Sequence, residues 1–147
     1  MTEVIGIDHI YLAVRDLEAS RRFYDVVMPV LGFRSGSFRI GGDEHLSYYN
    51  RHFGFVLRPA RSEAPHDPYA AGLHHFCLRV DNSSDVDHLA RELASRGITV
   101  TAPRLYPQYA PDYYAIFLED PDGIRLEVTN YRDERRRRHD HWHSDPG

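Results

Sequence analysis

Two histidines and one glutamate stand where their side chains could bind a divalent metal ion. A shift of 66 residues aligns residues 6–14 with residues 72–80, and His9 then coincides with His75. Near the other end of the chain, residues 124–129 alternate between apolar and polar types, which puts Glu127 on the polar face of a strand. Two imidazoles and one carboxylate form a facial triad. This ligand set holds Fe(II), Mn(II) or a similar ion and leaves positions open for substrate.

The two aligned segments have the period of two that is typical of half-buried strands. His9 and His75 begin the polar faces. A single histidine at the start of a strand is more often structural, and a glutamate on a polar face is usually solvated. The repeat favours the metal site instead. If the fold turns these polar faces inward, the charge of the glutamate would be buried without a partner unless a metal ion pairs with it, and burying an unpaired charge is costly. The opposite, apolar faces are formed by Ile10, Leu12 and Val14 and by Phe76, Leu78 and Val80.

Each strand is followed by the signals of one helix and three further extended segments. The first helix is predicted from Asp16 to Gly32, and the second is predicted to be capped by Ser84 and to stop at Gly97. The residues Asp120-Pro-Asp-Gly123 predict a turn between the last two strands. Each half of the chain is therefore βαβββ. The further strands are expected at 33–40, 46–50 and 55–57, and at 98–102, 113–119 and 124–130.

The expected fold class is α+β, with two tandem βαβββ modules that form a curved, partly open, β-barrel-like sheet with helices outside. Neither module could cover its sheet alone, so pairing should enclose a concave interior suited to a ligand. We expect a single domain over residues 1–131, with modules at 4–60 and 70–131. An Arg/His-rich tail, 132–147, should be solvated.

Composition excludes several classes of chemistry. Cys77 is the single cysteine among 147 residues, which rules out an internal disulfide and cysteine-rich metal centres. All 18 basic residues are arginine, so Schiff-base chemistry and a phosphate-loop lysine are excluded. The net charge of −4 argues against nucleic acid or a membrane surface as partner. No apolar run is long enough for a membrane span, so a cytoplasmic protein is expected.

Three segments resemble the vicinal oxygen chelate superfamily, which includes glyoxalase I, bleomycin- and fosfomycin-resistance proteins, methylmalonyl-CoA epimerase and extradiol dioxygenases. They are Asp8-His9-Ile10, His74-His75-Phe76 and the closing hairpin 113–127, and the resemblance covers about residues 4–131. It implies paired βαβββ modules and a divalent metal bound by His9, His75 and Glu127. It also implies a homodimer.

One position departs from the family pattern. The segment 54–58 aligns with 123–127, which puts Arg58 opposite Glu127. A guanidinium cannot ligate a metal because it stays protonated. The remaining three-ligand set is more similar to that of the extradiol dioxygenases than to that of glyoxalase I. Arg58 could steady an anionic substrate or pair with an acid.

The other candidates are tyrosines and histidines near these positions. Tyr11 is expected to touch substrate, and Tyr114 belongs to a proline-punctuated tyrosine cluster that could form a lid and supply an acid. We predict Tyr11, Tyr114 and Arg58 as catalytic residues, and His74 is the alternative to His75 as ligand. The remaining histidines are predicted at the surface (His45, His52 and His66) or in a tail tract that binds metal adventitiously (His139, His141 and His143).

The sequence thus favours a metal-dependent enzyme that acts on a small substrate with adjacent oxygens. The reaction is expected to be dioxygenase-like or glyoxalase/lyase-like, with Fe2+, Mn2+, Ni2+ or Zn2+ as cofactor. The alternative is a metal-free protein of the bleomycin-resistance type that binds and sequesters a small molecule. The three ligand residues would then be a polar patch in its cavity.

Overall fold

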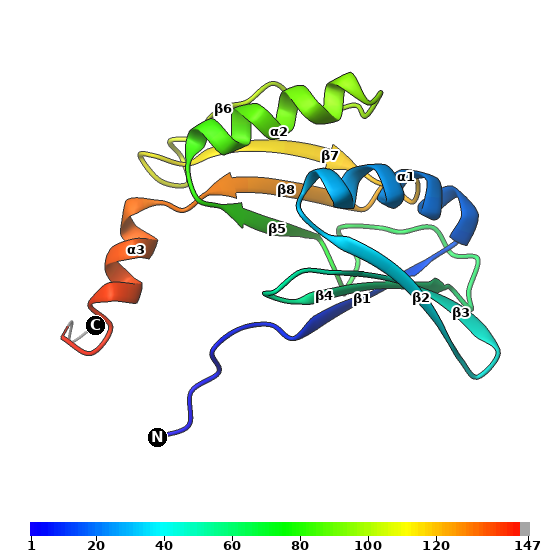
Figure 1. Ribbon diagram of the computed structural model, residues 1–147. Helices are drawn as coiled ribbons and strands as arrows, with labels where there is room; N and C mark the ends of the chain where they lie inside the picture. Colours follow the sequence, from blue (N-terminus) through cyan, green and yellow to red (C-terminus); the bar gives the residue numbers. More distant parts are fainter. Residues whose placement is uncertain (145–147) are drawn as a thin grey trace. The chain divides into compact units, whose positions relative to one another are not determined.

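The computed structural model describes residues 1–144, which group into two compact units (Figure 1). The first unit comprises Met1–Asp67 and the short segment Asp120–Gly123, and the second comprises Pro68–Glu119 and the chain from Ile124 onward. Each unit has the element order βαβββ and one four-stranded sheet, and in the second unit one more helix follows. The predicted α+β class and tandem modules are confirmed, although the strands form two sheets and not a single barrel-like one.

The first unit contains a sheet with strand order β1-β4-β3-β2. Its outer strand β1 runs parallel to β4, whereas the other neighbours are antiparallel. The alternation predicted for β1 is confirmed, since Leu12 and Val14 are buried while His9 and Tyr11 are exposed. The elements are β1 (His9–Val14), α1 (Leu17–Val30), β2 (Arg34–Ile40), β3 (Asp43–Tyr49) and β4 (Gly54–Pro59).

Helix α1 begins and ends close to the predicted residues. The Asp16 side chain accepts hydrogen bonds from the backbone N–H groups of Glu18 and Ala19, which would otherwise lack partners at the helix start. Gly32 has a φ of 86°, a left-handed conformation that favours glycine after a helix. The helix buries Tyr24, Val27 and Met28.

The predicted turn at 120–123 forms and belongs to the first unit. Gly123 has a φ of 79°, and its N–H donates to the carbonyl of Asp120 over 2.9 Å. The hydroxyl of the fully buried Tyr24 donates to Asp120 Oδ2 over 2.8 Å. Burial, together with the negative charge of Asp120, raises the pKa of Tyr24 well above its usual value. The phenol therefore stays protonated and keeps donating this bond.

Strand β2 lies at the edge of its sheet and is exposed at all seven positions. It pairs with β3 over its whole length, from Arg34 opposite Tyr49 to Ile40 opposite Asp43. Two of its side chains, Arg34 and Arg39, are cationic. The free edge of the first unit's sheet thus carries polar and charged side chains.

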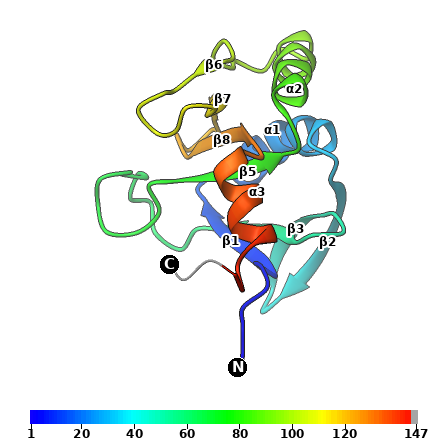
Figure 2. The same cartoon turned by 90° about the vertical axis from the view of Figure 1, so that its left-hand side faces the viewer.

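The second unit contains a sheet with strand order β5-β8-β7-β6, in which β5 and β8 are parallel. Helix α2 packs on one face of this sheet, against β5, β7 and β8 (Figures 1 and 2). Val86, Leu89 and Leu93 are buried on the helix side of that contact. The elements are β5 (His75–Val80), α2 (Ser83–Ser95), β6 (Arg104–Leu105), β7 (Tyr114–Glu119), β8 (Arg125–Asn130) and α3 (Asp133–Asp140).

The predicted cap of α2 was wrong by two residues. Asn82, not Ser84, is the N-cap, and its side chain accepts a hydrogen bond from the Asp85 N–H over 3.0 Å. The Asp85 carboxylate accepts from the Asn82 N–H in return, which completes a capping box. Ser84 instead donates from its hydroxyl to the Asn82 side chain over 2.5 Å.

The strand predicted at 98–102 is displaced to β6, which has only two residues. Thr101 still exchanges hydrogen bonds with Phe117, through its backbone N–H and its side-chain oxygen. Pro103 follows, and it has no N–H with which to continue the ladder. The pairing with β7 therefore resumes only at Arg104, opposite Ala115.

The segment predicted to be a solvated tail forms helix α3. Arg132, at its N-cap, is buried, and Arg136 donates to the Asp81 carboxylate over 2.5 Å, beyond the end of β5. The aliphatic part of an arginine side chain can cover apolar surface while its guanidinium reaches an acceptor. Residues 145–147 of the predicted tail lie outside the described residues. None of the helices in residues 1–144 is both long and apolar enough to cross a bilayer.

We expect Asn82→Ala to lower the free energy of unfolding by about 1 kcal/mol, because the Asp85 N–H in the first turn of α2 loses its acceptor. Ser84→Ala is the matched control and should change it by less than about 0.5 kcal/mol. Urea denaturation followed by circular dichroism measures both. The reverse order of effects would restore Ser84 as the cap.

Candidate functional site

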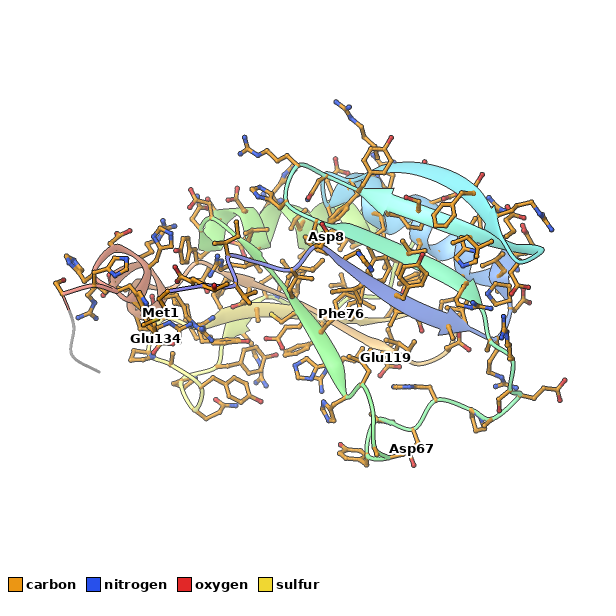
Figure 3. All side chains as sticks on the ribbon, turned by 90° about the horizontal axis from the view of Figure 1, so that it is seen from below. Met1, Asp8, Asp67, Phe76, Glu119 and Glu134 are labelled. Atoms are coloured by element: carbon orange, nitrogen blue, oxygen red, sulfur yellow. The ribbon has the colours of Figure 1, made fainter. Side chains whose placement is uncertain are left out.

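The polar face of the second unit's sheet brings together residues from three strands. His75 lies opposite Arg125 and Cys77 opposite Glu127 in the parallel pairing of β5 with β8. Residues directly opposite each other project from the same face. Phe117 of β7 lies opposite Glu127 and so shares this face. The other face, which α2 covers, carries Phe76, Leu78 and Val80 (Phe76 is labelled in Figure 3).

His75 and Glu127 are in direct contact. The distance from His75 Nε2 to Glu127 Oε1 is 3.3 Å, and the side chains are 37% and 4% exposed. The hydroxyl of Tyr113 donates to the other carboxylate oxygen, Oε2. A carboxylate buried to this extent needs such partners, since burial without them is costly. Each oxygen of Glu127 therefore has its own partner.

Tyr113 is the functional candidate that sequence reasoning passed over in favour of Tyr114. Tyr114 lies on the opposite face of the sheet, where its hydroxyl donates to Asp87 of α2 over 2.5 Å. The structure therefore does not bring Tyr114 together with His75 and Glu127. A signal for Tyr113 was available in the predicted hairpin. A turn at 120–123 puts the odd-numbered residues of both strands on one face, and Tyr113 shares that parity with Glu127.

Two protonated groups border the Glu127 carboxylate. The Cys77 sulfur lies 4.0 Å from the Tyr113 hydroxyl. Burial around the thiol, followed by the charge of Glu127, raises the pKa of Cys77 to about 12. Burial and the hydrogen bond to Glu127 likewise raise the pKa of Tyr113. Near neutral pH both groups keep their protons in the metal-free chain.

His74, the alternative ligand, is exposed and contacts His75. The two Nδ1 atoms are 2.7 Å apart, so one ring donates a hydrogen bond to the other. The His74 ring also makes an edge contact with Tyr69, with centroids 5.4 Å apart. Because Nδ1 of His75 makes this bond, its other nitrogen, Nε2, is the one that faces Glu127. His74 thus orients the candidate ligand and does not replace it in this arrangement.

An aromatic cluster lies beside Glu127. Tyr106 and Phe117 are buried, and Tyr113 packs against them. Two guanidinium groups lie over these rings, Arg132 at 4.5 Å from the Tyr113 centroid and Arg125 at 4.0 Å from the Phe117 centroid. Such cation–π contacts hold the guanidinium planes in place. Tyr109 extends the cluster by stacking on Tyr106, with centroids 5.9 Å apart.

The first unit carries His9 at the start of β1. Its Nδ1 is 2.7 Å from Asp8 Oδ2, and its side chain is 56% exposed. The Tyr11 ring lies at an edge to His9, with centroids 5.5 Å apart, and also contacts His45 at 5.9 Å. A carboxylate on one imidazole nitrogen orients the ring and leaves Nε2 as the outward nitrogen.

His45 and Arg58 of the first unit both contact Asp43. His45 is not a surface residue, because it is almost completely buried and stacked on Phe38, with its Nδ1 3.0 Å from the Asp43 carbonyl. Arg58 donates to the Asp43 carboxylate over 2.6 Å and is one-quarter exposed. This is the pairing with an acid that was one of its two interpretations. Asp43 thus contacts the His45 ring through its backbone carbonyl and the Arg58 guanidinium through its carboxylate.

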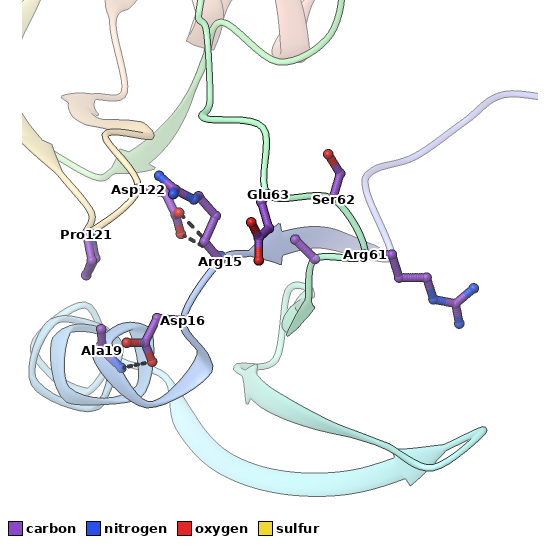
Figure 4. A pocket seen from close by; sticks show the side chains of 9 residues that line it. Arg15, Asp16, Ala19, Arg61, Ser62, Glu63, Pro121 and Asp122 are labelled. Atoms are coloured by element: carbon purple, nitrogen blue, oxygen red, sulfur yellow. Dashed lines mark hydrogen bonds between the residues drawn. The ribbon is translucent and has the colours of Figure 1, made fainter.

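A cavity of about 620 Å³ lies beside the N-terminus of α1 in the first unit (Figure 4). It is lined by charges of both signs, and two of its acids already have internal donors. Asp16 accepts from Ala19 N–H, and Asp122 accepts from Arg15 N–H over 3.3 Å. Among the described residues that line it, none is a predicted site residue.

Within either unit, no group of three or more His, Cys, Asp and Glu side chains among residues 1–144 is placed to hold a metal ion. The second unit brings together two of the predicted ligands, His75 and Glu127. The third, His9, belongs to the first unit. The roles of these three residues as ligands stay predictions.

Comparisons with known proteins agree with the fold and the motifs. The family model described as the Glyoxalase/Bleomycin resistance protein/Dioxygenase superfamily matches residues 6–128. The chain is 32% identical over 125 residues to the protein YqjT of Bacillus subtilis, covering 82% of this chain and 95% of that protein. It is 27% identical over 134 residues to biphenyl-2,3-diol 1,2-dioxygenase 2 of Rhodococcus globerulus, covering 89% of this chain and 66% of that enzyme.

Solved structures show the same architecture. A glyoxylase/bleomycin resistance protein/dioxygenase domain from Frankia sp. EAN1pec has a TM-score of 0.71 and 25% identity, with 88% of this chain and all of that chain covered. The lactoylglutathione lyase of Agrobacterium tumefaciens has a TM-score of 0.64 and 23% identity, with 88% and 96% covered. The second likeness concerns the fold alone.

The raised pKa of Cys77 predicts slow alkylation of the native, metal-free chain. At pH 8 its reaction with iodoacetamide should be on the order of a thousand times slower than in the urea-unfolded chain, because the thiolate is the nucleophile. The native rate should keep rising with pH up to about 12. Rates measured by mass spectrometry between pH 7 and 11 test this, and a plateau below pH 10 would contradict it.

Proposed function

The chain belongs to the Glyoxalase/Bleomycin resistance protein/Dioxygenase superfamily, and we propose that it is a divalent-metal-dependent enzyme acting on a small substrate with adjacent oxygens. The observation that carries the proposal is the contact between His75 Nε2 and Glu127 Oε1 on the polar face of the second unit's sheet. An imidazole nitrogen and a carboxylate oxygen that face each other are two donors of a facial triad.

The donor set of the second unit fits a metal ion. Nitrogen and oxygen ligands at about 2.1 Å from one ion are about 3 Å apart when they are neighbours. The observed separation of 3.3 Å is close to that spacing. The atoms that do not face this position are engaged elsewhere, His75 Nδ1 with His74 and Glu127 Oε2 with Tyr113. Such outer contacts orient ligands and are typical of metal sites.

His9 is the third ligand of the proposal. It occupies the position of the first module that corresponds to His75 in the second, and Asp8 holds its Nδ1. We propose Fe2+, Mn2+, Ni2+ or Zn2+ as the ion, since histidine and carboxylate ligands accept all four. Arg58 has no ligand atom to add, so the set ends at three.

When bound, a divalent ion with open positions polarises substrate oxygens as a Lewis acid. The surrounding residues then have distinct tasks. Tyr113 fixes the carboxylate of Glu127 through Oε2 and leaves Oε1 turned toward His75. Because the pKa of Tyr113 is raised, its phenol keeps the proton that it donates to Glu127, and this hydrogen bond holds the carboxylate in place. Tyr106 and Phe117 form an apolar wall that limits water on this side.

Two kinds of reaction are compatible with these tasks, oxygen insertion and lyase or isomerase chemistry. The Rhodococcus relative is named for a diol with adjacent oxygens, which supports a substrate of that kind. The three-ligand set also favours the dioxygenase-like reaction. We therefore rank it first.

Metal content tests the proposal directly. The exposed tail histidines are first removed in a His139→Ala/His141→Ala/His143→Ala background, so that adventitious binding does not contribute. After incubation with each ion and dialysis, this background should retain about one equivalent per chain. Glu127→Gln and His75→Ala should weaken retention by about 10- to 100-fold or more. Glu119→Gln, on β7 of the same sheet, is the matched control and should retain the ion.

Less than about 0.2 equivalents in the background protein, unchanged by His75→Ala, would contradict the proposal. A rise in melting temperature with an aromatic ligand but with none of the four ions would then support a metal-free binding protein.

A separate variant tests the third ligand. His9→Ala should lose the ion as His75→Ala does, while its metal-free melting temperature should shift by less than about 2 °C because the side chain is largely exposed. Ile7→Ala, two residues earlier and also exposed, is the matched control for changes at this end of the chain. Full metal retention by His9→Ala would exclude His9 as a ligand.

A further inference from the structure

Arg125 stands next to the proposed metal ligands and is not neutralised by a carboxylate. It is exposed on β8, opposite His75 in the pairing with β5 and two residues before Glu127 on the same face. Across residues 1–144, no carboxylate oxygen lies within 4.0 Å of its guanidinium, although Glu119 is its register partner on β7. By contrast, Arg58 and Arg136 are each bonded to an aspartate.

An aromatic ring holds this free cation. The Arg125 guanidinium lies 4.0 Å from the centroid of the Phe117 ring, and Phe117 is directly opposite Glu127. Stacking uses the face of the guanidinium plane and leaves its N–H groups, which point outward in the plane, available. Within residues 1–144, Arg125 is therefore a fixed pair of parallel donors that no carboxylate neutralises.

The position of this donor pair relates it to the candidate centre. Neighbouring strands are about 5 Å apart, and residues i and i+2 of one strand are about 7 Å apart. Arg125 is thus within the length of one small molecule from the oxygens of Glu127. A substrate bound by its adjacent oxygens at His75 and Glu127 would extend toward Arg125.

We propose that Arg125 is a specificity-determining residue that binds a carboxylate of the substrate, so that the substrate class is a small organic anion with adjacent oxygens. The adjacent oxygens rest on the proposed function, whereas the carboxylate rests on Arg125 alone. A planar carboxylate matches the guanidinium fork with two parallel hydrogen bonds. A doubly charged phosphate is disfavoured because one guanidinium cannot neutralise both of its charges and Glu127 is close by.

Arg79 provides a matched control. It lies on the same face of β5, its guanidinium is also stacked on an aromatic ring, at 3.9 Å from the centroid of Tyr131, and it also lacks a carboxylate within 4.0 Å in the described chain. It is four residues beyond His75, which is about 13 Å along a strand. Arg79→Gln therefore removes a similar charge at a distance from the candidate centre.

The first experiment needs no metal. Calorimetric titration of the metal-free, full-length chain should show benzoate binding at least about 10-fold more tightly than neutral benzamide, because a hydrogen bond to a charged group strengthens binding on this scale. Arg125→Gln should abolish this preference, and Arg79→Gln should keep it. Equal binding of both probes, an unchanged preference in Arg125→Gln, or tighter binding of inorganic phosphate would each overturn the inference.

The second experiment uses the metal-loaded chain with catechol and 3,4-dihydroxybenzoate, which differ by the carboxylate. The unsubstituted chain should prefer 3,4-dihydroxybenzoate by at least about 10-fold, and Arg125→Gln should reduce this ratio to about one with catechol binding unchanged. A ratio of one in the unsubstituted chain overturns the inference and leaves the metal site intact. Failure to load metal, with the benzoate preference retained, overturns the proposed function and supports the anion site.

Discussion

The buried carboxylate of Glu127 is the constraint on which the polar face of the second unit depends. Its side chain is almost fully enclosed, so each oxygen must have a partner, and His75 and Tyr113 are those partners. Residues around it also respond to its charge, since the pKa values of both Cys77 and Tyr113 are raised in part by Glu127. Burial and this one acidic group together raise the pKa values of both neighbours, so that each keeps its proton.

Much of this arrangement follows from strand periodicity. The period of two predicts that His75 and Glu127 share a face, and the repeat predicts two βαβββ modules; the structure confirms both. The prediction of Tyr114 relied on a cluster of tyrosines, whereas parity across the hairpin indicates Tyr113, whose hydroxyl contacts Glu127. The burial of His45 depends on Phe38 of the neighbouring strand, and a single strand's pattern cannot reveal such a contact.

Other differences have local causes that the pattern left ambiguous. Asn82 and Ser84 are both good cap residues, and only the backbone geometry decides between them, with Asn82 extended at φ −145°. Helix α3 contains no buried residues, so no apolar stripe marks it in the sequence. One of its own arginines makes contacts, since Arg136 is bonded to Asp81 and stacked at 4.3 Å over Tyr131. Charge alone does not distinguish such a helix from a solvated tail.

The edge strand β2 has a consequence for self-association. A strand that is exposed along its length can template pairing with another copy, and the cations Arg34 and Arg39 oppose such pairing by like-charge repulsion. Guanidinium groups do not lose their charge in alkaline solution, so this protection against fibril growth is independent of pH. It is instead weakened by dissolved ions, whose screening length falls to about 3 Å at 1 M salt. Concentrated brine, and not alkali, is therefore the condition in which this strand is most prone to stack into fibres.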